Sequence, residues 1–318
     1  MKRLLALIII FLAVLLIISG WWNSQLAAVS SDLTFQKIVI ARGKSVNEIA
    51  DQLRLKNLIR SSLAVSLYIR SKGLSTKISA GTFNLSPSMS TPQIVDILSG
   101  KPSEIWITLI EGWRIEEMAE ELNSGFRIQN SEFIKLAEEG YLFPDTYLFP
   151  DDVTAEQVVK KLRATFEERY SDDLRAKIRA QGLTNEEGVI LSSIVEREAR
   201  SEKARTEIAS ILLKRLKIGM GLNADATIQY ALGYQTQEKS WWKRHLTRDD
   251  LKIDSPYNSY LYRGLPPTPI CNPGLSSLEA VANADSSTPY LYYYHDSKGN
   301  SHYAKTLEEH NQNIANNP

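Results

Sequence analysis

The chain has few of the groups that usually hold a metal ion or a disulfide bond. Its 318 residues include one cysteine, Cys271, and four histidines, and none of them stand at the spacing of metal ligands. A single cysteine cannot form an internal disulfide bond, so the core alone must hold the fold. The sequence therefore predicts no metal site and no cofactor.

The chain also lacks an excess of charge of either sign. Lys and Arg together number 37, and so do Asp and Glu. A basic surface for nucleic acid is therefore not expected. Hydrophobic residues make up 43% of the chain and charged residues 23%, which is ordinary for a globular protein. At about 150 residues per domain, the length favours roughly two folded units.

The N-terminus carries the one long apolar run. Two basic residues precede an apolar stretch from Leu4 to Ile18, and two tryptophans follow it. The stretch is close to the ~20 residues that a helix needs to cross a bilayer, and basic residues favour the cytoplasmic side. We expect residues 1–22 to be a transmembrane signal anchor, with the N-terminus on the cytoplasmic side and the rest of this single-pass chain on the outer side. The alternative is a cleaved signal peptide with its cleavage site at residues 28–30.

A polar linker is expected at residues 23–35, and after it one pattern occurs twice. Residues 38–53 and 107–122 share an Ile, a Gly, a Glu, an Ala and a Leu at an offset of 69 positions. Each copy has the pattern of a short strand, a turn at the shared glycine and an amphipathic helix. The repeat favours duplicated small α+β units over residues 36–138, and chance similarity is the alternative.

A further helix is predicted between the two copies. Residues 90–92 (Ser-Thr-Pro) start it, and Gly100 ends it. Short helices beside short strands resemble LysM-like modules, which bind N-acetylated glycans. The resemblance implies a LysM-like architecture for residues 36–138, and glycan binding only secondarily.

Helical patterns dominate the rest of the chain, from about residue 139. An aromatic and proline-rich stretch near its start is expected to be a packed connection. Helices are predicted over residues 154–180, 185–200 and 203–218. The fold class is therefore α+β, with residues 139–318 forming a mostly helical domain that has a small β element.

The small β element is predicted near the C-terminus. Residues 298–300 (Lys-Gly-Asn) would turn a strand back on itself as a hairpin. The tyrosines at residues 290–294 alternate poorly with polar residues. They are therefore expected in the core and not as a platform for sugars.

The helix predicted over residues 185–200 carries the most informative side chain. A capping box at residues 184–187 sets its start. At about 100° per residue, Glu198 lies at the centre of the apolar arc, and Glu196 lies on the opposite face, where it is expected to be solvated. A carboxyl on a core-facing stripe loses hydration, which raises its pKa, as a general acid near neutral pH requires. The alternative is a buried Glu198 paired with a nearby arginine such as Arg200.

A proline-rich segment, residues 254–275, is longer than a loop that only connects two elements. We expect an ordered loop at a binding cleft. Tyr257 and Asn258 in this loop are candidate sugar contacts, and packing within the loop is the alternative. Asp225 is expected to cap a helix and is a weaker candidate for substrate binding.

Several motifs in one order resemble the YceG-like endolytic transglycosylases, the MltG family. Residues 191–198 (Leu-Ser-Ser-Ile-Val-Glu-Arg-Glu) are similar to the helix whose second glutamate is the family's proposed acid, and that position is Glu198. The resemblance extends over nearly the whole chain, including the anchor and the LysM-like region. Ala199 and residues 222–224 depart from the family pattern, which leaves detailed substrate contacts open. The other matching stretches are residues 140–147, 221–227, 257–260, 264–274 and 310–311.

The resemblance implies an enzyme that cuts peptidoglycan glycan strands between N-acetylmuramic acid (MurNAc) and N-acetylglucosamine (GlcNAc), leaving 1,6-anhydro ends. One Glu suffices, because the muramyl 6-hydroxyl serves as the nucleophile. The resemblance also implies that residues 139–318 are the catalytic domain and that the anchor lies in the bacterial inner (cytoplasmic) membrane, with the catalytic part on the outer, periplasmic side. It implies association with cell-wall synthesis proteins, the penicillin-binding proteins, as well. Two other functions stay open. One is a lysozyme-like hydrolase, for which Asp225 is a weak second carboxylate, and the other is a non-catalytic scaffold for wall synthesis.

Overall fold

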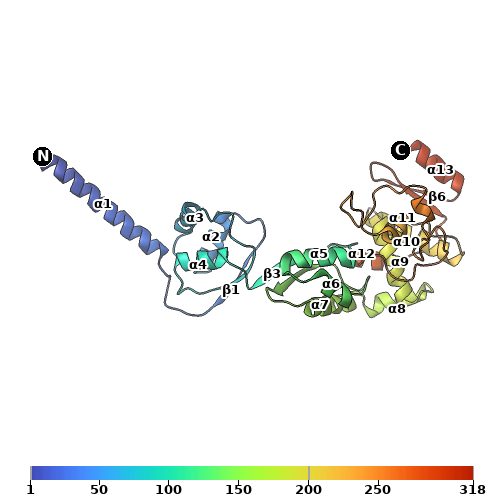
Figure 1. The fold of residues 1–318 in the computed structure, drawn as a ribbon, viewed down its shortest axis with the longest axis horizontal. Coiled ribbons are helices and arrows are strands. Elements are labelled where there is room, and N and C mark those ends of the chain that lie inside the picture. The colour runs from blue at the N-terminus through green and yellow to red at the C-terminus, as the bar shows by residue number, and fades with distance from the viewer. Residues whose placement is uncertain (1, 200, 318) are drawn as a thin grey trace. The chain divides into compact units, whose positions relative to one another are not determined.

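The structure, a computed structural model, describes residues 2–199 and 201–317, without the side chains of residues 2–9. Helices and short strands are both present (Figure 1), so the α+β class is confirmed. The chain divides into two compact units. Unit 1 is Met1–Ile107 with Leu148–Asp152, and unit 2 is Thr108–Tyr147 with Val153–Pro318. The domain boundary predicted at residues 138/139 stays a prediction.

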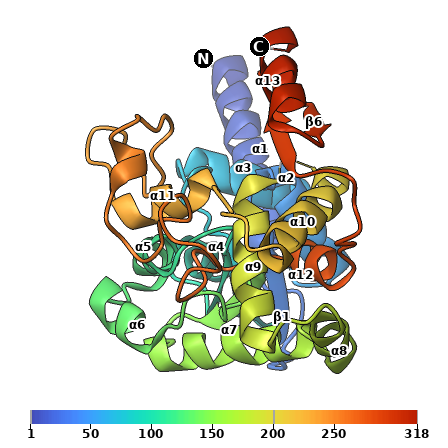
Figure 2. The same cartoon turned by 90° about the vertical axis from the view of Figure 1, so that its right-hand side faces the viewer.

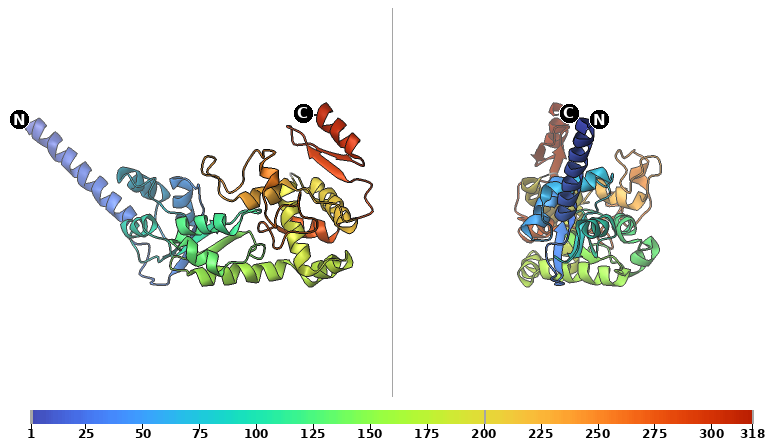
Figure 3. Two further views of the ribbon diagram at one scale, coloured as in Figure 1. Left: turned by 45° about the vertical axis from the view of Figure 1, so that its right-hand side comes forward. Right: turned by 90° about the vertical axis from the view of Figure 1, so that its left-hand side faces the viewer.

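Unit 1 begins with one long helix and continues with a small sheet and short helices. Figure 3 shows the long helix, α1, as one uninterrupted element. The four-stranded sheet has the order β1-β2-β3-β4, and β1 and β2 are antiparallel, with Ile38 opposite Phe83. The elements that begin here are α1 (Lys2–Leu26), β1 (Gln36–Ile40), α2 (Val46–Leu55), α3 (Ser62–Ser71), β2 (Gly81–Leu85), α4 (Thr91–Ser99), β3 (Glu104–Thr108) and, later in the chain, β4 (Thr146–Pro150).

The segment after α1 is attached to unit 1. The guanidinium of Arg60 donates to the carbonyl of Ala28 at 2.7 Å, and the amide of Val29 donates to the carbonyl of Pro87 at 3.1 Å. Residues 28–29 of the predicted linker therefore belong to the folded unit. In the described part of the chain, no helix is both long and apolar enough to cross a membrane. The side chains of residues 1–9, with which the predicted anchor begins, lie outside that part.

The strand–turn–helix pattern occurs twice in space as well as in sequence. The first copy is β1 followed by α2, and the second is β3 followed by α5, which spans Ile115–Phe126. The shared glycines, Gly43 and Gly112, have φ values of 86° and 78°. Only glycine adopts this conformation without steric cost. The pattern predicted from the repeat is confirmed.

Unit 2 is mostly helical, and α9 runs through its core. Figure 2 shows α9 in yellow, with α10 and α12 beside it. Residues 188–195 of α9 are all buried, because helices and loops cover this helix on every side. The elements are α5, α6 (Asn130–Leu136), α7 (Ala155–Arg169), α8 (Asp172–Ala180), α9 (Asn185–Glu198), α10 (Glu202–Lys217), α11 (Asp225–Leu232), the short η1 (Asp250–Lys252), α12 (Leu275–Ala282), β5 (Tyr292–His295), β6 (Ser301–Ala304) and α13 (Leu307–Asn316).

The helical pattern predicted over residues 154–180 is confirmed, and the chain forms two helices there. The first, α7, ends at Arg169, and Tyr170 leaves helical geometry with ψ of 66°. Ser171 then caps α8 by accepting a hydrogen bond from the amide of Leu174. Apolar periodicity continues across the break, whereas a serine cap ends one helix and starts the next.

Candidate active site

Glu198 is the last residue of α9 and faces a cavity in unit 2. The capping box predicted at the start of the helix is confirmed, since Thr184 accepts a hydrogen bond from the amide of Glu187. The cavity has a volume of about 550 Å³. Besides Glu198, its lining among the described residues is Arg197, Arg215, Asn223, Asp225, Ala226, Gln229, Arg244, Tyr260, Tyr292, Tyr293, Tyr294, His295, Leu307 and His310.

The carboxyl group of Glu198 is held by two hydrogen-bond donors. The amide of Ala226, in the first turn of α11, donates to Oε1 at 3.2 Å. The hydroxyl of Tyr293 donates to Oε2 at 3.0 Å. Burial raises the pKa of Glu198 to about 7, and the nearby charge of Asp225 also raises it, while the two donors oppose the shift. Such a carboxyl can both give and take a proton near neutral pH.

Asp225 lies beside Glu198 but does not cap the helix as predicted. It is the first residue of α11, and the position before it is Ala224, which makes no side-chain cap. The carboxylate of Asp225 instead accepts a hydrogen bond from the hydroxyl of Tyr260 at 2.6 Å. The structure therefore places a second carboxylate in the wall of the cavity.

Tyr257 and Asn258 are not among the described residues that line this cavity. Asn258 is 0% exposed. Its amide group donates to the carbonyls of Leu251 and Ile253 at 3.0 and 2.8 Å. The hydroxyl of Tyr257 lies 2.6 Å from that of Thr268. Both side chains hold the loop in shape, and their role as sugar contacts stays a prediction.

Tyr260 reaches the cavity from the same loop, and the sequence reasoning missed it. Its amide donates to the side-chain oxygen of Asn258 at 2.9 Å. That bond fixes a turn after which the Tyr260 side chain lines the cavity. The signal was present in the motif at residues 257–260, where Tyr260 follows Asn258 by two positions.

Glu196 is buried, so the prediction that it is solvated is wrong. Its side chain is 6% exposed and forms an ion pair with Arg205 at 3.3 Å. It also accepts a hydrogen bond from the amide of Gly274 at 2.9 Å. The helical wheel assumed one buried face, whereas the loop before α12 covers the opposite face as well. Arg200, the alternative partner for Glu198, lies outside the described residues.

The predicted C-terminal hairpin is confirmed, but its tyrosines are not core residues. Strands β5 and β6 are antiparallel, and α13 packs beside them (Figure 3). Tyr292, Tyr293 and Tyr294 are each only partly buried and line the cavity. A two-stranded ribbon has too few neighbours to bury both of its faces. The hairpin therefore supplies an aromatic wall to the site.

His295 joins this hairpin to the end of α9. Its Nε2 lies 2.9 Å from the backbone carbonyl of Glu198, and its Nδ1 lies 3.0 Å from the hydroxyl of Ser301. A carbonyl can only accept, so Nε2 carries the proton. The bond satisfies one of the carbonyls that a helix C-terminus leaves unpaired, and it brings Tyr293 within reach of the Glu198 carboxyl.

Replacing Tyr293 with Phe is expected to move the pH dependence of the site. The Tyr293 hydroxyl lowers the pKa of Glu198, so its loss raises that pKa further. Activity that needs protonated Glu198 then persists to higher pH, and the falling alkaline limb of a pH–rate profile shifts upward. Tyr294→Phe is the matched control, because Tyr294 lines the cavity without a hydrogen bond to Glu198. An unchanged limb in Tyr293→Phe would contradict this role.

Arg215 contributes fixed positive charge deep in the site. It is buried, and its guanidinium donates to the carbonyls of Leu291 and Leu222 at 2.7 and 2.6 Å. The guanidinium also lies 5.3 Å from the ring centre of Tyr292.

Within the described chain, no group of three or more His, Cys, Asp or Glu side chains is arranged to hold a metal ion. The reactive groups of the cavity are carboxyl, hydroxyl, imidazole and guanidinium groups.

Comparisons with known proteins agree with this geometry. The sequence profile of the YceG-like family matches residues 38–316. An endolytic murein transglycosylase of Bacillus subtilis (strain 168) is 32% identical over 93% of this chain and 90% of its own length. An endolytic murein transglycosylase of Streptococcus pneumoniae (serotype 2, strain D39) is 28% identical over 92% of this chain, which spans 60% of that longer protein.

A solved structure supports the same relationship. A YceG-like protein of Listeria monocytogenes, known from a crystal structure, is 30% identical and superimposes with a TM-score of 0.64. The match covers 87% of this chain and 98% of that one. The family profile, the relatives and the fold together show that the chain belongs to the YceG-like family.

Proposed function

We propose that this protein is an endolytic lytic transglycosylase that cuts peptidoglycan glycan strands between MurNAc and GlcNAc. The names of its relatives support this reaction class. The observation that carries the proposal is the Glu198 carboxyl, whose pKa burial raises to about 7 at the end of a buried helix, facing a cavity. Glu198 is the proposed catalytic residue, acting first as acid and then as base.

In the proposed reaction, the Glu198 carboxyl gives its proton to the glycosidic oxygen. The bond from that oxygen to the muramyl C1 breaks, its electron pair stays on the leaving GlcNAc oxygen, and positive charge develops at C1. The Glu198 carboxylate then takes the proton of the muramyl 6-hydroxyl, and O6 bonds to C1. Glu198 ends protonated, no water is consumed, and the products are a GlcNAc hydroxyl and a 1,6-anhydroMurNAc end.

The neighbours of Glu198 support both halves of this cycle. Burial and the charge of Asp225 favour the protonated acid, while the Ala226 amide and the Tyr293 hydroxyl stabilise the carboxylate that forms. The aromatic wall, which includes Tyr292 and Tyr294, offers flat faces for sugar rings. These groups would let one carboxyl first give a proton and then take one, so a single Glu suffices.

A hydrolase is the second candidate, because the cavity holds a second carboxylate, Asp225. If Asp225 activated a water molecule, the same cut would leave reducing ends. The test is mass spectrometry of strands digested by the full chain and by residues 27–318. Anhydro products, lighter than the hydrolytic ones by one water, support the transglycosylase. Reducing ends alone would favour the hydrolase, and undigested strands would favour the non-catalytic scaffold.

We propose that α1 anchors the chain in the cytoplasmic membrane, with the rest of the chain on the outer side. The basic residues before the apolar stretch and the tryptophans after it support this orientation. The full chain is expected to sediment with membranes and to be cut by protease added outside spheroplasts, whereas a chain lacking residues 1–22 stays soluble. Protection from external protease would contradict the proposed orientation.

We also propose that the LysM-like region, residues 36–138, binds glycan strands and that wall-synthesis proteins are partners of the chain. The repeated strand–turn–helix pattern supports the first assignment. The second is what the resemblance to the YceG-like family implies. Retention of glycan strands by the full chain in a Glu198→Gln background tests the first role, and co-purification of penicillin-binding proteins with the full chain tests the second.

A further inference from the structure

Among the described residues, no group holds the guanidinium of one arginine that lines the cavity, Arg244. Of the arginines in its lining, Arg197 lies 3.8 Å from the ring centre of Trp242, and Arg215 donates to backbone carbonyls. Arg244 is exposed and lines the cavity. Its guanidinium makes no hydrogen bond or ion pair with any described residue. This cation is therefore available to a ligand.

The backbone around Arg244 is fixed by several side chains. Gln229, itself in the cavity wall, donates to the carbonyl of Lys243 at 2.7 Å. The amide of Arg244 donates to the carboxylate of Glu238 at 2.9 Å. The ammonium of Lys243 forms an ion pair with Asp250 at 2.7 Å. The position of Arg244 is thus built, although its guanidinium is left free.

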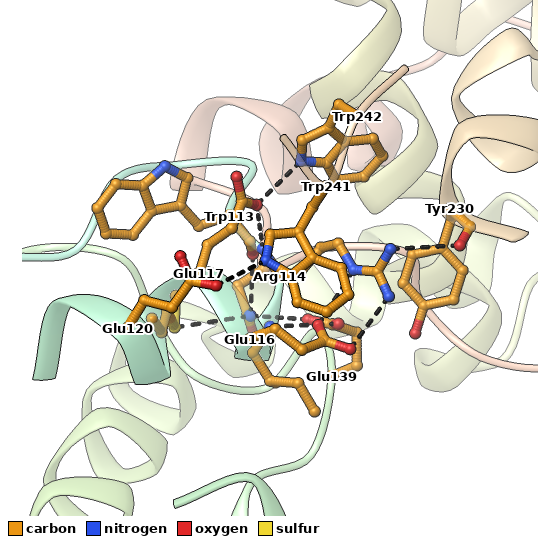
Figure 4. Close-up of polar contacts among 12 residues, drawn as sticks. Trp113, Arg114, Glu116, Glu117, Glu120, Glu139, Tyr230, Trp241 and Trp242 are labelled. Atoms are coloured by element: carbon orange, nitrogen blue, oxygen red, sulfur yellow. Dashed lines mark hydrogen bonds and ion pairs between the residues drawn. The ribbon is translucent and has the colours of Figure 1, made fainter. Parts of the chain in front are cut away.

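Trp241 and Trp242, the two residues before Lys243, are attached to α5. Figure 4 shows the indole nitrogen of Trp242 directed to the carboxylate of Glu117, a bond of 2.9 Å. The indole nitrogen of Trp241 donates to Glu120 at 3.0 Å. The guanidinium of Arg114 packs 4.8 Å from the Trp241 ring centre, and Arg114 is only 5% exposed. Two successive tryptophans therefore anchor the segment that presents Arg244.

We propose that Arg244 binds a carboxylate carried by the muramyl residue of the substrate. This inference rests on the proposed function. Arginine pairs with carboxylates through two parallel hydrogen bonds, and GlcNAc has no carboxylate. The MurNAc side has two sources: the carboxylates of its peptide and, where the peptide has been removed, its own lactyl carboxylate. Arg244 would thus distinguish the two sugars on either side of the cut and set which bond meets Glu198.

The test measures strand binding by the full chain in detergent, in a Glu198→Gln background that prevents cleavage. The variants are Arg244→Gln and, as a matched control, Arg248→Gln, because Arg248 is exposed in the same loop but outside the cavity lining. The ligands are peptide-bearing strands, strands stripped by an amidase, and chitin oligosaccharides, which have no carboxylate. Arg244→Gln is expected to weaken binding to carboxylate-bearing strands about 10-fold, with a smaller difference at high salt.

Each outcome decides the proposal. Weaker binding to peptide-bearing strands alone identifies a peptide carboxylate, and weaker binding to stripped strands alone identifies the lactyl carboxylate. Equal behaviour of Arg244→Gln and Arg248→Gln, or an equal loss on chitin oligosaccharides, would overturn it. Wild-type protein is assayed for cleavage in parallel. If it neither cuts nor binds strands, the proposed function fails, whereas normal cutting with no Arg244 effect overturns this inference alone.

Discussion

Glu198→Gln is expected to lower the rate of strand cleavage by about 10³-fold, within the range that general acid–base catalysis contributes. The amide of Gln cannot supply the proton that the leaving oxygen needs. The substitution should leave the fold intact, because Gln can accept from the Ala226 amide and donate to the Tyr293 hydroxyl, the two partners of Glu198. The measurement is the yield of anhydro-ended fragments, with circular dichroism as the check on folding.

The same variant should change how stability depends on pH. The folded protein holds the pKa of Glu198 at about 7, above its ordinary value of 4.5. The folded state therefore binds more protons than the unfolded state between these values, and the wild type loses stability as pH rises from about 4.5 to 7. Gln does not titrate, so Glu198→Gln should be the more stable protein above pH 7.

Glu196→Gln is the comparison for both effects. It lies two positions earlier in α9, and it is paired with Arg205 and the Gly274 amide instead of facing the cavity. Cleavage is expected to continue, with some loss of stability because Gln offers one acceptor oxygen where two are used. Full activity in Glu198→Gln, or loss of activity in Glu196→Gln with the fold retained, would remove Glu198 from its assigned role.

Asn272→Ala is expected to lower the free energy of unfolding by roughly 3–5 kcal/mol, more than the other substitutions proposed for this protein. Each buried polar group left without a hydrogen-bond partner costs about 1–3 kcal/mol. Asn272 is 0% exposed. Its side-chain oxygen accepts from the amides of Gly140 and Leu142, both at 3.0 Å. Its amide group donates to the carbonyl of Trp113 at 3.1 Å and to Glu139 at 2.9 Å. Alanine would leave all four groups without this partner.

Glu139 adds to the cost of that substitution. Its carboxyl is deeply buried, and this burial raises its pKa to about 8. Without the Asn272 amide, the buried carboxyl of Glu139 has one hydrogen bond fewer. Chemical denaturation at pH 7 measures the loss. Asn283→Ala is the control, because Asn283 is exposed and its side chain donates only to the carbonyl of Glu279. Equal denaturation midpoints for the two variants would show that the hydrogen bonds of the Asn272 side chain do not stabilise the fold.

Features set by neighbouring residues could be predicted from the sequence. The strand–turn–helix repeat follows from apolar spacing and from glycines that need positive φ, and the start of α9 follows from its capping box. The hairpin follows from Gly299, whose φ is 86°. The position of Glu198 on the apolar face of α9 could be predicted in the same way, because it depends only on the period of the helix.

Features set by distant segments could not be predicted. Tyr293 and His295, which hold Glu198, follow it by 95 and 97 residues. Glu196 looked solvated because the helical wheel does not include the loop that reaches it through Gly274. For Asn258 the sequence leaves two roles open, because a polar side chain in a loop has the same pattern whether it binds a substrate or the carbonyls of its own loop.

The division of the chain has a practical consequence for anyone who truncates this protein. The backbone passes from one unit to the other after Ile107, after Tyr147 and after Asp152. No single cut therefore yields unit 2 alone: a fragment starting at Thr108 keeps residues 148–152 but loses most of β3, the neighbour of β4 in the sheet. An unpaired strand edge of this kind invites aggregation, so expression trials should keep both units or delete residues 148–152 as well.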